Sequence, residues 1–385
     1  MTIGELHQDE SVRRREFPVC EKGVFLAHAG VSPIPRRVGE AMACYISACA
    51  QGDQENVLPR GLTLETRKLA AELLECLPEE IALIGPTSVG LSMVANGLDW
   101  RAGDNVVFYG DDYPANAVPW MALERQKVEL RGIQPKQLGL ITLKEIEPLV
   151  DKRTRLVALA SAHFISGYRT DLKAIGQLVK LRGALFCVDG IQTLGALRTP
   201  ATHADFLAAD SHKWLLGPCS AGILFVRREA REKLRPILLG ADNVNCKNYI
   251  TPQTIEFRPH AGRYEPGSPN FVGIVGLHAA LKLLKECGHL EIEKTALEHT
   301  RYLRDGLRKR DYALACEADD GLSGITSFRR NGADMGALHC KLTKANITTS
   351  LRQTREGKQW IRCSPHFYNT REELDRLLNL VGDKK

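Results

Sequence analysis

The sequence predicts an α/β fold with a mainly parallel sheet that is covered by helices on both faces. Over the first two thirds of the chain, short apolar runs rich in β-branched residues alternate with amphipathic stretches, which is typical of such a sheet. After about residue 270 the pattern changes to long helices followed by short strands. This change indicates a second, smaller α+β domain, and 385 residues are enough for both.

The large domain is expected to contain short buried strands, each an apolar run bounded by turn residues. They cover residues 81–84, 105–110, 155–161, 184–188, 205–209 and 222–226. Helices are expected between them at 88–98, 115–127, 142–150 and 171–182. The strand at 222–226 follows 205–209 with no helix between them, so at least one strand of the sheet is expected to be antiparallel.

The small domain is expected to follow the Gly- and Pro-rich stretch "RYEPGSPNFVG". Its helices are predicted at 273–287, 290–309, 334–345 and 370–381, and its strands at 324–329, 347–352 and 360–364. Thr370 caps the last helix, which has acidic residues in its first turn. We therefore expect an N-terminal segment over 1–30 that packs with the small domain, a large domain over 31–268 and a small domain over 269–385.

Composition and charge argue against several classes of protein. Hydrophobic residues make up 44% and charged residues 25% of the chain, with a net charge of +6, as in ordinary globular proteins. No run approaches the ~18 apolar residues of a membrane helix, and the polar N-terminus has no apolar signal core. The basic run from Arg13 to Arg15 predicts a solvated helix face or a mobile arm. We expect neither a membrane nor a nucleic-acid partner.

Eleven cysteines are scattered along the chain, and none lies in C-x-x-C spacing. This pattern favours neither a disulfide framework nor a zinc site, and we expect no metal. Cys187 lies in an apolar run, where a thiol behaves as a small hydrophobe. The predicted compartment is the reducing cytoplasm.

The residues around one lysine, Lys213, give the first indication of a functional site. It lies in "AADSHKWLLGP" between a histidine and a tryptophan, just after an apolar run. Lysine is rarely buried without a partner, and at the mouth of a sheet it can be a nucleophile, a counter-ion or a phosphate ligand. Asp189 ends another apolar run, "ALFCVD". In open α/β sheets, ligands bind at the carboxyl ends of the strands.

Two further strand ends carry hydroxyl or aromatic side chains. Thr87 and Ser88 follow "IALIGP" at the start of a predicted helix. Their hydroxyls and the first amides of the helix suit a phosphate, although such residues more often serve as a cap alone. Tyr113 follows "FYGDD", where it can stack on a flat heterocycle or simply pack against its neighbours.

Together, the lysine, the carboxylate, the phosphate turn and the aromatic side chain point to pyridoxal 5′-phosphate (PLP). Its aldehyde needs a lysine, and its ring nitrogen needs a carboxylate that keeps it protonated. Opposite charges ~4 Å apart gain about 4 kcal/mol at an effective dielectric of about 20, which is roughly 3 pKa units. An NAD-dependent dehydrogenase is the alternative, and the absence of G-x-G-x-x-G disfavours it.

The motifs "VDGIQTLGAL" and "SHKWLLGP" resemble those of the class V aminotransferase family. That family includes cysteine desulfurases, selenocysteine lyases, isopenicillin-N-epimerase-like proteins and kynureninases. The resemblance runs from "LAHAGVSPIP" to "IRCSPHFYNTREELDRLL". It implies a fold-type-I PLP-dependent transferase with a mainly parallel, seven-stranded large-domain sheet. It also implies a homodimer with active sites at the interface.

The resemblance assigns a role to each matching residue. Lys213 is implied to form the Schiff base with PLP, and Asp189 to pair with the pyridinium nitrogen. Gln192 is implied to bond the phenolic oxygen, and Tyr113 to stack on the ring in place of the histidine of many desulfurases. The implied phosphate ligands are Thr87, Ser88, His212, Ser211 and, across the dimer interface, Ser268.

The implied substrate site centres on an arginine near the C-terminus. Arg362 matches the arginine that binds the substrate α-carboxylate, which suits the fork of a guanidinium. Arg352 is expected to assist it, and His28 to line the substrate side. The family's usual asparagine near the cofactor has no counterpart in "SAHFISGYRTDL", where His163 or Phe164 stands in that region.

One departure from the family pattern bears on the reaction. A typical desulfurase carries a mobile catalytic cysteine shortly before the substrate arginine, and "TTSLRQTREGKQW" contains none. Cys363 directly follows Arg362, but it lies in a predicted strand and is expected to be packed there. The predicted function is a PLP-dependent enzyme that binds an amino acid as an external aldimine and removes its Cα proton. A C–S lyase or an aminotransferase is favoured; the alternatives are a cysteine desulfurase, an amino-acid epimerase and an inactive PLP-fold binding protein.

Overall fold

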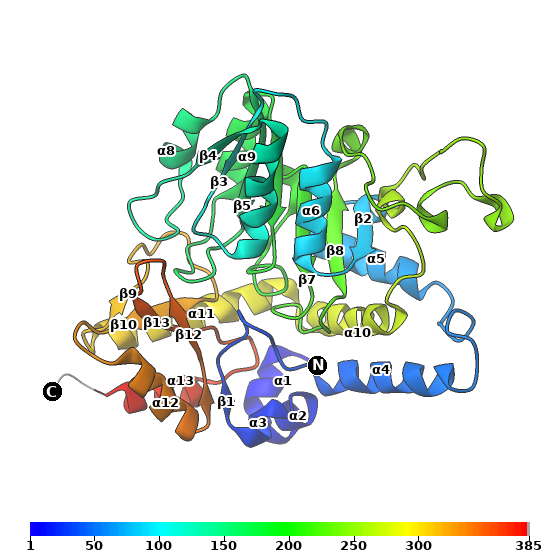
Figure 1. Ribbon diagram of the computed structural model, residues 1–385. Coiled ribbons are helices and arrows are strands. Elements are labelled where there is room, and N and C mark those ends of the chain that lie inside the picture. Colours follow the sequence, from blue (N-terminus) through cyan, green and yellow to red (C-terminus); the bar gives the residue numbers. More distant parts are fainter. Residues whose placement is uncertain (383–385) are drawn as a thin grey trace.

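The computed structural model describes residues 1–382. A large α/β domain lies beside a small α+β domain, and a helical N-terminal segment lies against the small domain (Figure 1). The large domain is built on a seven-stranded sheet with the order β2-β8-β7-β6-β5-β3-β4. Its strands are β2 (Ile81–Ile84), β3 (Asn105–Phe108), β4 (Glu129–Gly132), β5 (Thr154–Ala160), β6 (Leu185–Asp189), β7 (Phe206–Asp210) and β8 (Gly222–Val226). The predicted α/β fold is confirmed.

The direction of the strands follows from the connections between them. Strands β3 to β7 pair in parallel, whereas β8 runs antiparallel to both β7 and β2. The expected antiparallel strand is therefore confirmed, because the short connection from β7 to β8 contains no crossover helix. The sequence does not predict the edge strand β4, whose residues "ELRG" are partly exposed and form no apolar run.

Helices bury both faces of this sheet, as a doubly covered sheet requires. Successive strand residues point to opposite faces, and alternate residues of β5 and β6 accordingly belong to two different apolar cores. One core includes helices α5 (Leu62–Leu74), α9 (Leu172–Leu181) and α10 (Phe271–Cys287). The other includes α6 (Thr87–Gly97) and α7 (Val118–Met121).

Two predicted helices are shorter in the structure than the sequence pattern suggests. The segment 115–127 contains only α7 between two 3-10 turns. Pro119 lies in the first turn of α7, and its missing amide prevents the helix from beginning earlier, near residue 115. The segment 142–150 contains α8 (Leu143–Ile146) followed by another 3-10 turn, because Pro148 has no amide with which to continue the helix.

The small domain contains an antiparallel sheet with the order β12-β13-β10-β9. Its strands are β9 (Ala313–Leu314), β10 (Thr326–Arg329), β12 (Ser350–Gln353) and β13 (Gln359–Cys363), and its helices are α11 (His289–Arg308), α12 (Met335–Lys344) and α13 (Arg371–Val381). The division after residue 268 stays a prediction. Helix α10 packs on α4 (Arg36–Cys49) and α5 rather than on this sheet.

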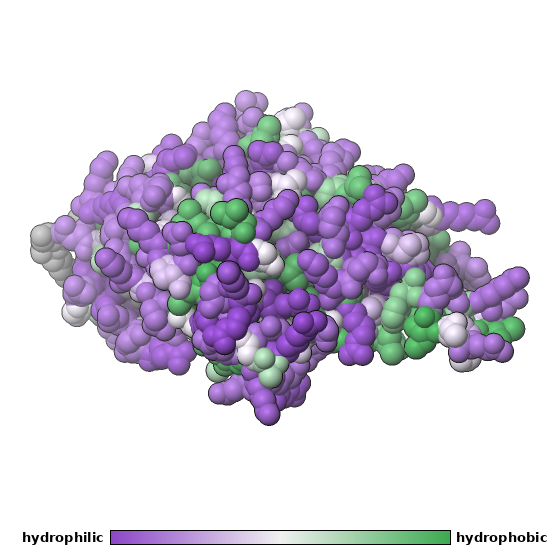
Figure 2. All heavy atoms as spheres, turned by 90° about the horizontal axis from the view of Figure 1, so that it is seen from above, coloured by the Kyte–Doolittle hydropathy of each residue, from purple (hydrophilic) through white to green (hydrophobic). Residues whose placement is uncertain are grey.

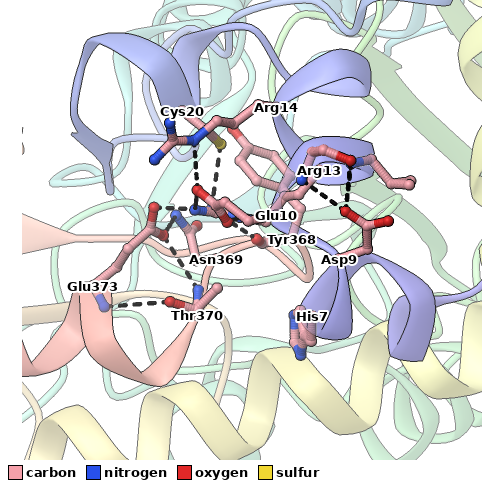
Figure 3. A network of polar contacts seen from close by, with 12 residues as sticks. His7, Asp9, Glu10, Arg13, Arg14, Cys20, Tyr368, Asn369, Thr370 and Glu373 are labelled. Carbon is pink, nitrogen blue, oxygen red and sulfur yellow. Dashed lines mark hydrogen bonds and ion pairs between the residues drawn. The ribbon is translucent and has the colours of Figure 1, made fainter.

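The N-terminal segment is tied to the small domain by backbone pairing and by a buried arginine. Strand β1 (Val24–Phe25) pairs in parallel with β11 (Ile347–Thr348). In front of β1, the short helices α1 (Ile3–Gln8), α2 (Glu10–Glu16) and α3 (Val19–Lys22) lie near the start of α13 (Figure 3).

Arg13 is the centre of this contact, and it corrects part of the prediction for the basic run. Arg14 and Arg15 are exposed on a helix, as expected, but Arg13 is only 4% exposed. Its Nη1 lies 2.8 Å from Glu373 Oε1, and its Nε lies 2.7 Å from Glu10 Oε2 (Figure 3). The helix turns this one guanidinium toward the C-terminal helix, where it pairs with a buried carboxylate.

Among residues 1–382, no helix combines the length and the apolar character needed to cross a membrane.

Replacing Arg13 by methionine is expected to lower the free energy of unfolding by about 3 kcal/mol, because the Glu373 carboxylate then stays buried without its charged partner. Arg14→Met is the matched control, since Arg14 is exposed and bonds to the same Glu10. It is expected to change the free energy by less than ~1 kcal/mol. Urea denaturation of the purified variants measures both values, and equal midpoints for the two variants contradict the proposed role of Arg13.

Candidate active site

A cavity of about 260 Å³ opens at the carboxyl ends of the large-domain strands, where the small domain approaches them. It brings together side chains that are far apart in the sequence. Of the residues predicted from the sequence, it is lined by Thr87, Ser88, Tyr113, Asp189, Gln192, His212, Lys213, Arg352 and Arg362. The geometry therefore unites the lysine, the strand-end acid, the phosphate turn, the aromatic ring and both arginines. No cluster of three metal-ligating side chains occurs among the described residues.

Lys213 lies three residues after the end of β7 and is only 7% exposed. Its Nζ lies 5.3 Å from the centre of the Tyr113 ring. Burial lowers the pKa of Lys213 to about 8, and the nearby Asp189 carboxylate opposes this shift. The neutral, nucleophilic amine is therefore far more populated near physiological pH than in an exposed lysine.

Asp189 is the last residue of β6 and is 3% exposed. Its Oδ1 accepts a hydrogen bond of 3.0 Å from the amide of Ile191. Burial raises the pKa of Asp189 to about 6, while the Ile191 amide and the Lys213 charge pull it down. The carboxyl is mostly ionised at pH 7 and can hold a proton on a neighbouring ring nitrogen.

Asp210, the last residue of β7, organises the end of the cavity where the predicted phosphate ligands Thr87 and His212 lie. The amide of Asp210 donates to Thr87 Oγ1 at 2.9 Å, which leaves the hydroxyl proton of Thr87 available to a ligand. Asp210 Oδ2 lies 2.7 Å from His212 Nδ1, so Nε2 is the nitrogen that remains for a ligand. Helix α6 begins at Thr87, and its first amides have no partner within the helix.

The loop that carries Tyr113 is held by a second buried acid, Asp112. Asp112 accepts hydrogen bonds from the Tyr113 amide at 2.7 Å and from Asn116 Nδ2 at 3.0 Å. Burial, followed by the Asp189 charge, raises the pKa of Asp112 to about 7. Tyr113 itself is 47% exposed and makes an edge contact with Phe164. Its ring is therefore free to cover a planar ligand above Lys213.

Asp112 and Asp210 are the site residues that the sequence analysis missed. Both are acids at the carboxyl end of an apolar strand, which is the signal that selected Asp189. Applied to every strand, the same rule finds them. However, this rule cannot distinguish an acid that faces the cavity from an acid that holds a neighbouring loop in place.

Arg362, on β13, is 1% exposed and is only partly paired. Its Nη1 donates to the Phe164 carbonyl at 2.7 Å. Its Nε and Nη2 are buried and have no acceptor among the described residues. Burial, followed by the charge of Arg352, lowers the pKa of Arg362 to about 9. An unpaired guanidinium edge at this depth is suited to a carboxylate ligand.

Gln192 also faces the cavity, and its side chain is fixed from two directions. Its Nε2 donates to the Ala29 carbonyl at 3.3 Å, and its Oε1 accepts a hydrogen bond of 3.3 Å from Trp214 Nε1. Ala29 and Gly30 form the neighbouring wall. The N-terminal segment is therefore part of the site.

Three predicted residues do not line the cavity. His28 is fully buried, and its ring bonds to the Ser364 carbonyl and the Tyr368 hydroxyl behind the wall, so it does not lie on the substrate side. The hydroxyl of Ser211 is also buried and donates to the Pro218 carbonyl, so it does not face the cavity. Ser268 is exposed, with Oγ 3.3 Å from Glu55 Oε1; its expected role concerns the site of a second subunit.

Comparison with known proteins identifies the family. The model of the family "Aminotransferase class-V" matches residues 24–377. The chain belongs to the class-V aminotransferase family. Family membership confirms the expected PLP cofactor and the expected class of enzyme.

Several relatives of this class-V protein are named for sulfur chemistry. A "Probable cysteine desulfurase" of Methanothermobacter thermautotrophicus is 29% identical, with 94% of this chain and 95% of that protein covered. A "Cysteine desulfurase" of Klebsiella pneumoniae is 30% identical, with 78% and 76% covered.

Solved structures show the same fold. The apo cysteine desulfurase from Thermococcus onnurineus NA1 superposes with a TM-score of 0.87 at 24% identity, over 96% of each chain. The cystine C-S lyase C-DES, in complex with its reaction product cysteine persulfide, gives 0.86 at 21% identity, over 94% of this chain and 98% of that one. These structures confirm the predicted two-domain fold.

We expect the apoprotein to take up PLP about tenfold faster for each pH unit up to pH 8, and at a constant rate above it. The lowered pKa of Lys213, about 8, means that the reactive neutral amine becomes the dominant form only above that pH. Stopped-flow absorbance measures the rate, with Lys213→Arg as the unreactive control. A rate that still rises between pH 9 and pH 10 contradicts the lowered pKa.

Proposed function

We propose that this protein is a PLP-dependent C–S lyase that acts on cysteine-type amino acids and releases their sulfur on a small molecule. The observation that carries this proposal is the absence of a thiol at the site. None of the residues that line the cavity within the described chain is a cysteine. A sulfur atom that leaves the substrate therefore has no protein acceptor beside it.

The hairpin between β12 and β13 supports the same conclusion. Its turn consists of residues 354–358, "TREGK", in the region where a typical desulfurase carries its mobile cysteine. Arg355 at this turn makes a 2.6 Å contact with Asp111 of the large domain. Cys363 at the end of β13 is fully buried, and burial raises its pKa far above the usual range. Neither position offers a reactive thiolate.

The residues present fit PLP, because a buried amine, a strand-end acid and a helix N-terminus with free donors face one cavity. Thr87, Ser88 and His212 would hold its phosphate, Asp189 its ring nitrogen and Gln192 its phenolic oxygen. When bound, PLP supplies an electron sink for the negative charge that develops at the substrate Cα.

The remaining residues orient the substrate and move a proton. The free Nε–Nη2 edge of Arg362 would bind the α-carboxylate in two parallel hydrogen bonds. Lys213 would accept the Cα proton as a general base, because its lowered pKa makes the neutral amine far more available than in an exposed lysine. Tyr113 would cover the ring and exclude water from one face. With cystine, the Cβ–S bond breaks with its electron pair on sulfur, and with one water the products are pyruvate, ammonia and cysteine persulfide.

A cysteine desulfurase is the second candidate, because relatives at 29% and 30% identity carry that name. Such an enzyme converts cysteine to alanine and leaves a persulfide on a protein thiol. The products therefore distinguish the two candidates. An aminotransferase would instead release a keto acid that retains its sulfur.

We also propose a homodimer in which Ser268 reaches the phosphate of the other subunit's site. A segment after β8 projects from the large domain (Figure 1), and hydrophobic groups interrupt the mainly hydrophilic surface toward that end (Figure 2). The Asp242 amide in this segment donates to the Pro266 carbonyl, close to Ser268. The exposed apolar residues of this projecting segment are Leu238, Leu239, Tyr249, Ile250 and Ile255.

Sedimentation velocity tests this assembly, since a dimer has about twice the mass of the 42.7 kDa chain. Charged replacements at Leu239 and Ile250, which are 58% and 71% exposed, are expected to shift the protein to monomers. A monomer in the unchanged protein contradicts the proposed dimer.

All eleven cysteines are free thiols in the structure. Free thiols persist in reducing compartments, so we propose that the protein works in the cytoplasm. Cell fractionation with an antibody against the chain tests this placement.

The holoenzyme is expected to convert L-cystine to pyruvate and an equal amount of sulfane sulfur on a small molecule. Lactate dehydrogenase coupling and cyanolysis measure the two products, and mass spectrometry is expected to find no persulfide on the protein. Lys213→Ala is expected to lose the borohydride-sensitive yellow absorbance and to lower kcat by about 10³-fold or more. Alanine together with a protein-bound persulfide would identify a desulfurase instead.

Cys363→Ala is the control for the missing thiol. Cys363 is buried beside the site and has no assigned role. The kcat of the Cys363→Ala variant is therefore expected to stay within about twofold of that of the unchanged enzyme. If the Cys363→Ala variant stops releasing sulfur while the unchanged enzyme still releases it, the result favours the desulfurase over the lyase.

A further inference from the structure

The loop of residues 163–168, between β5 and α9, joins the small domain to the active site. The Phe164 carbonyl accepts a hydrogen bond of 2.7 Å from Arg362 Nη1. The next carbonyl, of Ile165, accepts one of 2.5 Å from the hydroxyl of Ser327 on β10. Two strands of the small domain therefore hold this loop from one side.

The loop begins with His163, a buried histidine whose two ring nitrogens are both bonded. Its side chain is 3% exposed, and a side-chain carbon placed at Gly139 would lie 2.3 Å from its Cγ. The Ser166 amide donates to Nδ1 at 3.1 Å. The ring proton is therefore on Nε2, which donates to the Asp111 carbonyl at 3.3 Å. Burial lowers the pKa of His163 to about 4, so the ring stays neutral near pH 7 and keeps this single N–H.

Asp111 belongs to the loop that carries Tyr113, two residues further along the chain. Within this loop, Asp112 bonds to the Tyr113 amide, which shapes the loop but does not attach it to other segments. Two side chains from elsewhere reach Asp111: His163 bonds to its carbonyl and Arg355 to its carboxylate. The side chain of Arg355 is 74% exposed, and exposed ion pairs contribute little. The buried bond from His163 is therefore the stronger attachment of this loop.

The position of the Tyr113 ring depends on the same two loops. Its centre lies 5.3 Å from Lys213 Nζ, and its edge contact with Phe164 has a centroid distance of 5.6 Å. Phe164 lines the cavity, whereas His163 lies behind it and is not a lining residue. His163 can therefore act on the cofactor site only through its neighbours.

We infer that His163 is a positioning residue whose Nε2–H bond to the Asp111 carbonyl holds the Tyr113 ring over the bound cofactor. Phe164, the next residue, accepts the bond from Arg362, so one short loop fixes both the aromatic cover and the arginine of the site. The inference rests on the part of the proposed function that places Tyr113 over PLP. It does not depend on which reaction the enzyme catalyses.

Pyridoxine 5′-phosphate is a suitable probe, because it has the ring and the phosphate of PLP but no aldehyde. It therefore binds the apoprotein without a covalent bond to Lys213. Calorimetry measures its Kd, and the stoichiometry reports the folded fraction of each variant. Tyr113→Ala is expected to weaken binding by about 3- to 10-fold, through loss of the ring contact.

Two substitutions of equal length separate the hydrogen-bond donor from the size of the side chain. His163→Gln places an amide donor at the position of Nε2, and its Kd is expected to stay within about twofold of the unchanged value. His163→Met has the same length without a donor and is expected to weaken binding by about 3- to 10-fold, the range of one buried hydrogen bond. His163→Asn keeps an acceptor for the Ser166 amide but does not reach Asp111. It is expected to match His163→Met and replaces that variant if it does not fold.

Two controls test the route through Tyr113. Arg355→Gln removes the exposed contact with the same Asp111 and is expected to change Kd by less than about twofold. In a Tyr113→Ala background, His163→Met is expected to add less than about twofold, because the ring that His163 positions is gone.

Three results overturn the inference. The first is equal weakening by His163→Gln and His163→Met, which assigns His163 to packing. The second is an unchanged Kd in the donor-less variants or in Tyr113→Ala. The third is a loss from His163→Met that persists in full without the Tyr113 ring. Failure of the holoenzyme to cleave cystine overturns the lyase function alone, because the binding experiment uses no catalysis.

Discussion

The burial of Lys213 opposite Asp189 is the constraint on which the active site depends. Removing both groups from water moves their pKa values toward each other, to about 8 for the lysine and about 6 for the acid. Their mutual attraction opposes burial and keeps each group from losing its charge entirely. Above about pH 8 the pair therefore offers a mostly neutral amine beside an ionised carboxylate.

The sheet holds this pair in place through the ends of two adjacent strands. Strands β6 and β7 pair in parallel, with Asp189 opposite Ala208, so their carboxyl ends meet at one edge. The antiparallel strand β8 brings Gly222 against the Gly85 carbonyl, where any side chain would collide with the backbone. This close approach places the turn before α6 beside the end of β7, and Thr87, Ser88 and Lys213 share one cavity as a result.

The small domain and the N-terminal segment complete the cavity from the other side. The β12–β13 hairpin supplies both arginines, and the Arg355–Asp111 contact ties its turn to the loop that carries Tyr113. Arg13 fixes the N-terminal helices to α13 through Glu373, and the chain then runs along the small domain to the wall at Gly30. Parts of the chain that lie outside the large sheet therefore form one side of the cavity.

The sequence by itself determined the α/β class, most strands and the residues at their ends, because these features depend on local apolar patterns and on chain order. For that reason the sequence alone predicted four of the residues that line the cavity: Lys213, Asp189, Thr87 and Tyr113. Only the tertiary structure decided which side chains turn toward the cavity. His28, in a matching motif, lies behind the wall, whereas Asp112 supports the Tyr113 loop and Arg352 is left unpaired. Burial and pairing depend on contacts between distant segments, and no local pattern contains them.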